Sequence, residues 1–171
     1  MNNKMDYKYL LSLDGGGVRE IATITFLKEL EDALGIPLYK KFDFFIGTSA
    51  GAITAMAISI AKMQGEKLLN FWSEDNLNLI LNSSLWDSRL GLMQINPKYD
   101  GEGKKKVLSN YFGNLKLGDA SGDLAIMSYD VEERKPLLLT SYNDPDISVI
   151  DAAIATSAAP IYYPTAKVGN R

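Results

Sequence analysis

The 171-residue sequence contains neither cysteine nor histidine. Without cysteine there can be no disulfide, no thiolate metal site and no cysteine nucleophile. Without histidine, a hydrolytic mechanism has no imidazole to serve as general base, and a zinc site loses its commonest ligand. These two absences exclude several hydrolase and metalloprotein classes before any motif is considered.

A strong charge of one sign and a long apolar run are also missing. The 18 basic and 21 acidic residues give a net charge of −3, which is too even to indicate nucleic acid as a partner. The most apolar helix-like segment, residues 50–61, is shorter than the roughly 20 residues needed to cross a bilayer, and no secretory signal is visible at the start. We expect a cytoplasmic protein or one peripheral to a membrane, with non-standard export left open; oligomeric state is not encoded in these patterns.

A strand, a glycine turn and a helix follow one another twice in the first third of the chain. Tyr7–Leu13 predicts a buried strand that ends at Gly15–Gly17, and the helix after it stops at Gly35. Phe42–Ile46 predicts a second buried strand, and Gly51–Met63 a helix that is apolar nearly all round. This βαβ order predicts an α/β fold with a mostly parallel sheet. The apolar face of the first helix is expected to comprise Ile21, Ile24, Leu27, Leu30 and Leu34.

The rest of the chain predicts further helices and one pair of strands. Ser148 and Asp151 form the pattern of an N-terminal capping box, which predicts that a helix begins there and ends near Ser157. The other expected elements are a helix over Glu66–Asn82, a loop over Ser83–Gly103, a short helix over Lys104–Tyr111, and paired strands over Asp123–Asp130 and Leu137–Tyr142.

The first motif with chemical meaning is Gly47-Thr48-Ser49-Ala50-Gly51, a G-x-S-x-G between a buried strand and a buried helix. A serine on such a sharp turn has its hydroxyl lifted clear of the backbone, at a helix N-terminus that favours developing negative charge. The glycines are required because a side chain there would clash with neighbouring backbone. The alternative interpretation is a glycine-rich turn with an idle serine.

The second motif is Asp14-Gly15-Gly16-Gly17-Val18-Arg19, between the first strand and the first helix. Consecutive glycines let several backbone N–H groups converge on a small anion, such as the oxygen of a tetrahedral intermediate. A dinucleotide-binding turn is a rival interpretation, but Glu20 replaces its third glycine, and the expected acidic residue falls at Glu31 or Asp32, inside the helix. An anion-binding loop without a catalytic role is a second rival.

Together the two motifs resemble the patatin-like phospholipase family. The resemblance extends to segments along the rest of the chain, in the order that the family has them, from about Tyr9 to the end. These segments are Lys41-Phe42-Asp43 before the serine motif, Lys98-Tyr99-Asp100-Gly101, Tyr111-Phe112-Gly113, and Ala155-Thr156-Ser157-Ala158-Ala159-Pro160 with Tyr163-Pro164.

The resemblance implies a three-layer α/β/α fold and a serine–aspartate dyad that cleaves acyl esters without histidine, metal or cofactor. The implied substrate is a phospholipid or another acyl lipid, with contact at the membrane periphery and no nucleic acid. Ser49 would be the nucleophile. Gly15, Gly16, Gly17 and Arg19 would supply the oxyanion loop, Ala50 would add its N–H on general elbow geometry, and Gly47, Thr48 and Gly51 would complete the elbow.

One departure from the family concerns the acid. The family aspartate lies in an Asp-Gly-Gly or Asp-Gly-Ala motif a short way beyond the Ala155–Pro160 stretch, and the sequence reaches Arg171 without such a motif there. We therefore expect a C-terminally incomplete patatin-like domain over residues 7–171, after a short tail of residues 1–6, with the aspartate beyond Arg171. Asp144 and Asp151 are not followed by glycine. Loss of the base costs on the order of 10⁴ in rate, so an inactive lipid-binding or regulatory remnant is the alternative function.

A second departure is Glu20, where the family pattern has glycine. An acidic residue in the first turn of a helix is favourable with the helix dipole. A carboxylate beside an oxyanion hole would instead oppose the charge that the hole stabilises, unless Arg19 offsets it.

Two weaker signals allow two interpretations each. The apolar side chains of the long irregular stretch could form a lipid-facing flap or a loop packed on the core; they are Trp86, Leu90, Leu92, Met93 and Ile95. The run Lys104–Lys106 could contact anionic headgroups or form a solvated helix face.

Overall fold

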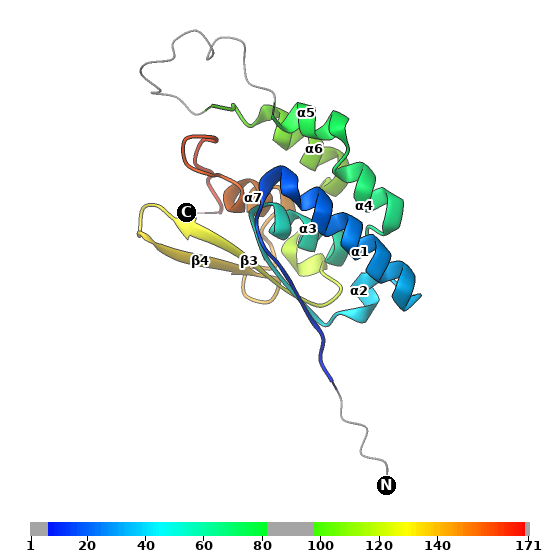
Figure 1. The fold of residues 1–171 in the computed structure, drawn as a ribbon. Helices are drawn as coiled ribbons and strands as arrows, with labels where there is room; N and C mark the ends of the chain where they lie inside the picture. Colours follow the sequence, from blue (N-terminus) through cyan, green and yellow to red (C-terminus); the bar gives the residue numbers. More distant parts are fainter. Residues whose placement is uncertain (1–6, 82–97, 170–171) are drawn as a thin grey trace.

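A computed structural model describes residues 7–81 and 98–169 of the protein. Its centre is a four-stranded sheet in the order β1-β2-β3-β4 (Figure 1). The first three strands are parallel and β4 runs antiparallel to β3, which confirms the predicted α/β fold with a mostly parallel sheet. The strands are β1 (Leu10–Leu13), β2 (Phe44–Thr48), β3 (Asp123–Asp130) and β4 (Lys135–Thr140).

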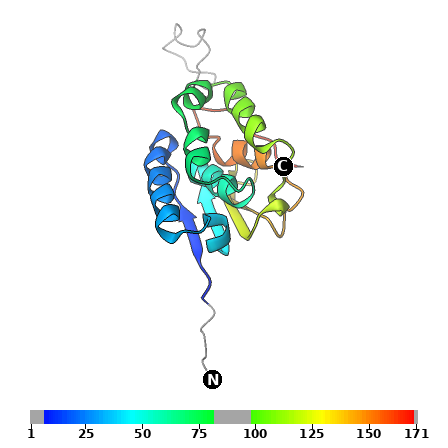
Figure 2. The same cartoon turned by 90° about the vertical axis from the view of Figure 1, so that its right-hand side faces the viewer.

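The described helices lie on one face of this sheet (Figures 1 and 2). Helix α3 packs against β1, β2 and β3, and α7 packs against β3 and α3. This is the arrangement that right-handed crossovers produce when parallel strands follow one another in a single direction. Within the described residues the chain therefore forms two of the three predicted layers. The helices are α1 (Glu20–Leu34), α2 (Leu38–Lys41), α3 (Ser49–Ser59), α4 (Gly65–Phe71), α5 (Glu74–Ile80), α6 (Glu102–Phe112) and α7 (Val149–Thr156), with short 3₁₀ turns η1 (Gly17–Arg19) and η3 (Leu117–Asp119).

The two faces of the sheet differ in burial. The face toward α3 is buried. Its residues include Phe45 and Gly47 on β2, and Leu124 and Ile126 on β3. The opposite face leaves large apolar side chains exposed, among them Leu10, Met127, Tyr129 and Leu138. The hydrophobic core thus lies between the sheet and the helices. None of the helices in residues 7–81 and 98–169 is long and apolar enough to span a membrane.

The first two strand–turn–helix units agree with the sequence analysis in type and order. Helix α1 ends at Leu34, and Gly35 follows with a left-handed φ of 66°, as its stop signal predicted. Only part of the predicted apolar face is buried, because α1 packs mainly on α4: Ile24 and Leu27 are inaccessible, whereas Ile21 and Leu34 are exposed. Strand β1 begins three residues later than predicted, and of its residues only Leu13 is buried, so the expectation of a buried strand there was wrong. Strand β2 begins two residues later than predicted.

The predicted single helix over Glu66–Asn82 is wrong. It breaks into α4 and α5 at Trp72, where the backbone leaves helical geometry. The hydroxyl of Ser73 then accepts the N–H of Asn76 and caps α5. The buried Trp72 ring contacts Phe71 edge-on. Packing of the two aromatic rings and a new cap thus override helical continuity.

Two later boundaries also move. Helix α6 begins at Glu102 rather than at Lys104, directly after Gly101 with its φ of 83°. The strand predicted over Leu137–Tyr142 is β4, shifted two residues toward the N-terminus, because a short turn held by the Asp130 carboxylate connects it to β3. The cap predicted at Ser148 is present, but the Ser148 hydroxyl accepts the N–H of Ile150, and the described residues show no capping-box bond between Ser148 and Asp151.

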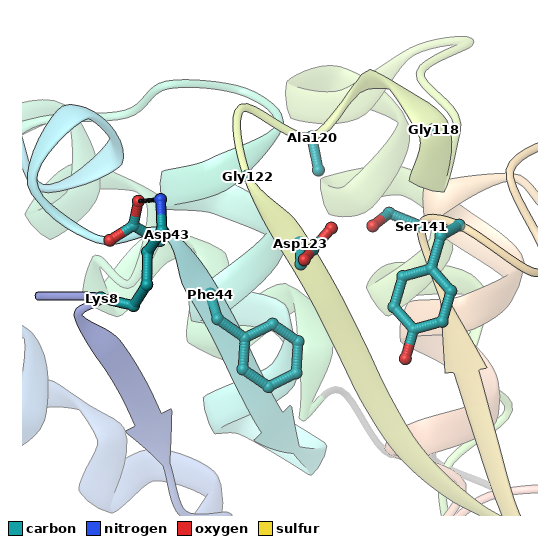
Figure 3. Close-up of a pocket in the computed structure, with 9 residues that line it drawn as sticks. Lys8, Asp43, Phe44, Gly118, Ala120, Gly122, Asp123 and Ser141 are labelled. Atoms are coloured by element: carbon teal, nitrogen blue, oxygen red, sulfur yellow. Dashed lines mark hydrogen bonds and ion pairs between the residues drawn. The ribbon is translucent and has the colours of Figure 1, made fainter. Parts of the chain in front are cut away.

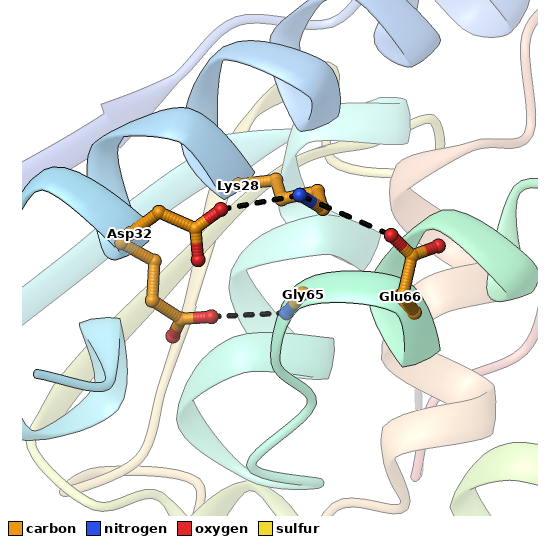
Figure 4. A network of polar contacts seen from close by, with 5 residues as sticks. Lys28, Asp32, Gly65 and Glu66 are labelled. Carbon is orange, nitrogen blue, oxygen red and sulfur yellow. Dashed lines mark hydrogen bonds and ion pairs between the residues drawn. The ribbon is translucent and has the colours of Figure 1, made fainter. Parts of the chain in front are cut away.

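The C-terminal half of α1 is tied to its neighbours by carboxylates (Figure 4). The two oxygens of Glu31 accept from the N–H groups of Leu38 and Gly65, both at 2.9 Å. Lys28 forms ion pairs with Asp32 at 3.1 Å and with Glu66 at 3.9 Å. Glu31 therefore has a structural partner at the start of α2 and another at the start of α4.

Two glycines allow α3 to begin against the sheet. A side-chain carbon at Gly51 would lie 2.4 Å from the carbonyl oxygen of Leu13 and 2.5 Å from that of Asp14. A side-chain carbon at Gly47 would lie 2.7 Å from the backbone nitrogen of Ala52. Real atoms do not approach so closely, so only glycine permits this contact between α3 and the end of β1.

Gly51→Ala is expected to lower the free energy of unfolding by about 3 kcal/mol, because backbone must move to admit the methyl group. Urea denaturation measures the loss. The matched control is Gly16→Ala, whose added carbon meets no atom closer than 3.6 Å; it should cost much less. Equal losses in the two variants would contradict the close approach at Gly51.

Candidate active site

Ser49 lies at the turn between β2 and α3. Thr48 is still extended, with φ −133° and ψ 145°, and the backbone reverses at Ser49, whose φ is 52°. A positive φ is unusual for a residue other than glycine and costs on the order of 1 to 3 kcal/mol. The Ser49 side chain is half-buried, whereas the helix behind it is buried throughout Ala50–Ser59. The G-x-S-x-G motif thus forms a strained strand-to-helix turn.

The glycine loop after β1 runs beside this serine. A side-chain carbon at Gly15 would lie 3.0 Å from Cβ of Ser49 and 3.1 Å from the carbonyl oxygen of Thr48. Gly17 then takes a φ of 56°, and the N–H of Arg19 donates to the carbonyl of Gly16 at 3.2 Å. The loop is tight, and its start lies against the serine turn.

The other predicted site residues fall around the same turn. Ala50 is in the first turn of α3, where backbone N–H groups have no partner within the helix. Arg19 is exposed at the end of η1. The start of the glycine loop lies beside the serine turn because the two follow adjacent parallel strands, and Ala50 follows Ser49 directly; the roles of these residues stay predictions.

Thr156, which the sequence analysis did not single out for a role, holds the serine turn from the opposite side. The N–H of Ser49 donates to the Thr156 hydroxyl at 2.9 Å, and that hydroxyl donates to the carbonyl of Met127 at 2.5 Å. Thr156 thus joins α7, β3 and the turn. The only available signal was its place in the Ala155–Pro160 stretch, because the contact joins residues 107 positions apart.

Glu20 lies in the first turn of α1, and its side chain is enclosed rather than turned to solvent. Its side chain is 1% exposed, and Oε1 has no hydrogen-bond partner in the described residues. Thr54 Oγ1, on α3, is buried and unpaired in the same way. Burial raises the pKa of the Glu20 carboxyl, and the nearby Thr54 hydroxyl offsets only part of this effect. A carboxyl that is costly to ionise therefore lies directly after the glycine loop.

Lys104 is buried, so the interpretation of Lys104–Lys106 as a solvated helix face is wrong for this residue. It is 4% exposed, whereas Lys105 and Lys106 are exposed as expected. Its ammonium donates to the carbonyl and hydroxyl oxygens of Ser157, at 3.1 and 3.0 Å, and lies 3.1 Å from the centroid of the Tyr163 ring. Burial lowers the pKa of Lys104 to about 8. The side chain is part of the core next to the end of α7.

Within the described residues no carboxylate hydrogen-bonds to Ser49. Asp144 accepts the N–H of Thr140 at 3.0 Å and so stabilises the turn after β4, while Asp151 is exposed on α7. Neither occupies the position of a base for the serine. The same residues contain no cluster of three or more acidic side chains suited to a metal ion. The predicted flap residues, Trp86 to Ile95, lie outside the described residues.

An open cavity of about 580 Å³ lies at the other end of the sheet (Figure 3). Phe44 and Asp123, the first residues of β2 and β3, line it, together with Asp43 and Ser141. Ser49 follows the carboxyl end of β2, so this cavity and the serine turn are at opposite ends of the strands. None of the predicted site residues lines the cavity.

Comparison with known proteins assigns residues 11–171 to one family. The family model described as Patatin-like phospholipase matches residues 11–171. The chain is 31% identical to a cGAMP-activated phospholipase of Pseudomonas aeruginosa, over 93% of this chain and 49% of that protein. It is also 31% identical to Patatin-like protein 4 of Arabidopsis thaliana, over 92% of this chain and 44% of that protein. The chain thus spans about half the length of these curated relatives.

Solved structures agree with this fold. VipD of Legionella pneumophila matches with a TM-score of 0.59 and 15% identity, over 93% of this chain and 43% of that one. Full-length ExoU of Pseudomonas aeruginosa, solved in complex with SpcU, matches with a TM-score of 0.55 and 18% identity, over 92% and 39%. At these identities the likeness concerns the fold alone.

Thr156→Val is expected to destabilise the protein by about 1 to 2 kcal/mol, because it leaves the Ser49 N–H and the Met127 carbonyl without their shared partner while keeping the side-chain volume. Thr156→Ser is the matched control, since it retains the hydroxyl. Urea denaturation compares the two. A valine variant as stable as the serine variant would show that the hydroxyl contributes nothing to the turn.

Glu20→Gln is expected to flatten part of the pH dependence of stability. The folded-state pKa of Glu20 is raised, so the folded state binds more protons than the unfolded state between pH 4.5 and that raised pKa. The wild type should therefore gain stability relative to the variant as pH falls from 7 toward 4.5. Urea denaturation at several pH values, with exposed Glu29→Gln as control, measures this gain. A constant difference between wild type and Glu20→Gln would contradict a raised pKa.

Proposed function

Because the chain belongs to the patatin-like phospholipase family, we propose that it catalyses acyl transfer from a lipid ester to Ser49, followed by hydrolysis of the acyl-serine. The observation that carries the proposal is the strained turn of Ser49, with φ 52°, at the start of α3 and directly beside Gly15. A serine in this position presents its hydroxyl where backbone N–H groups can meet a substrate oxygen.

The proposed reaction has two steps. The Ser49 hydroxyl oxygen attacks the ester carbonyl carbon, its proton passes to a carboxylate, and the bond to the leaving alcohol breaks as the alcohol takes that proton. Water then attacks the acyl-serine by the same route and releases the fatty acid. The carboxylate is the aspartate of a Ser-Asp dyad, which the family resemblance implies in an Asp-Gly-Gly or Asp-Gly-Ala motif beyond the Ala155–Pro160 stretch; no such motif follows that stretch within residues 1–171.

The oxyanion is assigned to backbone donors on two elements. In this proposal Gly15, Gly16 and Gly17 supply N–H groups of the loop, Ala50 adds one from the first turn of α3, and Arg19 ends the same loop. Loss of a single donor of this kind typically costs 10²- to 10³-fold in kcat. The positive end of α3 contributes in the same direction.

The substrate class proposed is a phospholipid or another acyl lipid, met at the membrane periphery. The names of the relatives support this class, since one of them is called a phospholipase and the family description carries the same word. The nucleotide-binding alternative is weakened at both acidic residues that could contact a ribose. Glu31 accepts the N–H groups of Leu38 and Gly65, and Asp32 is paired with Lys28.

A second candidate function is lipid binding without turnover. The observation in its favour is that no carboxylate in residues 7–81 and 98–169 hydrogen-bonds to Ser49, and that Glu20 brings an acidic group to the turn after the glycine loop. In that case the same surface would hold an acyl lipid, and Ser49 would not be acylated.

A fluorophosphonate probe tests the first proposal on the natural gene product that contains residues 1–171. The probe should label the wild type and the Ser109→Ala control, which removes an exposed serine of α6, but not Ser49→Ala. Hydrolysis of phosphatidylcholine vesicles should fall by on the order of 10⁴ in Ser49→Ala.

Labelling that persists in Ser49→Ala would remove Ser49 from the mechanism. Wild type that binds the vesicles but neither takes up the probe nor releases fatty acid would support the second candidate instead.

A further inference from the structure

We propose that Lys104 is a positioning residue for Ser49, acting through Ser157 and Thr156 at the end of α7. The inference deepens the proposed function and rests on it for its catalytic meaning. The structural part of the inference does not depend on whether the protein hydrolyses lipid. It states that the buried Lys104 ammonium on α6 fixes the last turn of α7, and that this turn holds the backbone of Ser49.

The contacts of Lys104 use the whole ammonium group. An ammonium has three N–H donors, and three acceptors surround this one: the carbonyl oxygen of Ser157, the hydroxyl oxygen of Ser157 and the face of the Tyr163 ring. No donor is left for an added anion, so the site holds protein and not a ligand. The Ser157 hydroxyl in turn donates to the carbonyl of Ala153 at 2.6 Å, inside α7.

The charge of Lys104 is not explained by an ion pair. In the described residues no carboxylate lies within 4.0 Å of its ammonium, and only 4% of the side chain is exposed. A buried cation is costly unless its surroundings compensate for lost water. The carbonyl end of α7 does so, because a helix C-terminus carries partial negative charge. An apolar residue would fill the same space without that cost, which indicates that the polar contacts matter.

The path from Lys104 to the serine is short and continuous. Ser157, which Lys104 holds by two hydrogen bonds, is the neighbour of Thr156 in the chain. The Thr156 hydroxyl accepts the N–H of Ser49 at 2.9 Å and donates to the carbonyl of Met127. If the end of α7 shifts, the acceptor for Ser49 shifts with it. The positive φ of Ser49 then loses the contact that opposes its relaxation.

The other side of the cluster is anchored as well. The Tyr163 hydroxyl donates to the carbonyl of Ile80 at 3.1 Å, at the end of α5, and its ring lies 5.2 Å from that of Tyr99. Lys104 therefore lies between the end of α7 and an aromatic ring that α5 holds in place. This arrangement limits the movement of the ammonium, which a positioning role requires.

The test is a double-mutant cycle on the same natural gene product, read by hydrogen exchange at the Ser49 amide. Lys104→Met keeps an unbranched side chain of similar volume and removes its charge and donors. It should lower protection of the Ser49 amide fivefold to tenfold, the factor that one hydrogen bond contributes, while the Ile58 amide inside α3 stays as protected as before. In a Thr156→Val background, Lys104→Met should cause no further loss at Ser49. Lys105→Met, on the exposed face of α6, is the control.

A second measurement, of kcat and KM, tests whether Lys104 affects catalysis. Lys104→Met should lower kcat for phosphatidylcholine vesicles by about the same factor and leave KM unchanged, because it alters the geometry of the nucleophile and not lipid binding. If Lys104→Met does not fold, Ser157→Ala removes one of the two polar acceptors and should give a smaller loss at the Ser49 amide.

Equal loss of protection at Ser49 and Ile58, or losses that add in the Thr156→Val background, would overturn the inference and leave Lys104 with a packing role only. A wild type without fatty-acid release would count against the proposed function alone, since the exchange cycle would still show whether Lys104 acts on Ser49 through Thr156.

Discussion

The start of α3 packs against the carboxyl end of β1 so closely that no side chain fits between them. At Gly51 a side-chain carbon would lie 2.4 Å from the Leu13 carbonyl, and at Gly47 one would lie 2.7 Å from the Ala52 nitrogen. Because both positions lack a side chain, the helix begins directly on the sheet. The turn at Ser49 must then reverse within one residue, which accounts for its φ of 52°. The loop at Gly15 follows from the same contact, since it leaves β1 where α3 touches that strand.

The local glycine contacts explain which features could be predicted from the sequence. Each strand–glycine–helix unit is encoded within one continuous segment, from Leu10 to Leu34 and from Phe44 to Ser59, by apolar runs and glycines, so its type and order are readable. The family resemblance added the pairing of the two glycine motifs. By contrast, the break of the helix predicted over Glu66–Asn82 depends on how the Trp72 ring packs. The bond from Ser49 to Thr156 joins positions 107 apart, and no local pattern specifies such a partner.

The buried charges were the least predictable part, for a related reason. A lysine within Lys104–Lys106 and a glutamate in a first helical turn are usually solvated, and composition cannot show that a particular one is enclosed. Glu20 and Lys104 are nevertheless buried, one against α3 and the other against α7. Both elements also contact the serine turn. The usual preference of charged side chains for solvent is therefore overridden close to the proposed site. Proteins tolerate such a cost in stability at functional sites more often than elsewhere.

A strained serine turn cannot be maintained by its own segment, because φ of 52° is unfavourable for serine in isolation. What holds it comes from later in the chain: the Thr156 hydroxyl on α7, itself bonded to β3 at Met127. The first 63 residues contain both sequence motifs, yet they do not contain the contact that keeps Ser49 in place. The geometry of the nucleophile is consequently a property of the assembled sheet and of α7, and it forms only when elements distant in sequence have packed together. A motif search finds the serine; the fold determines whether its hydroxyl is presented.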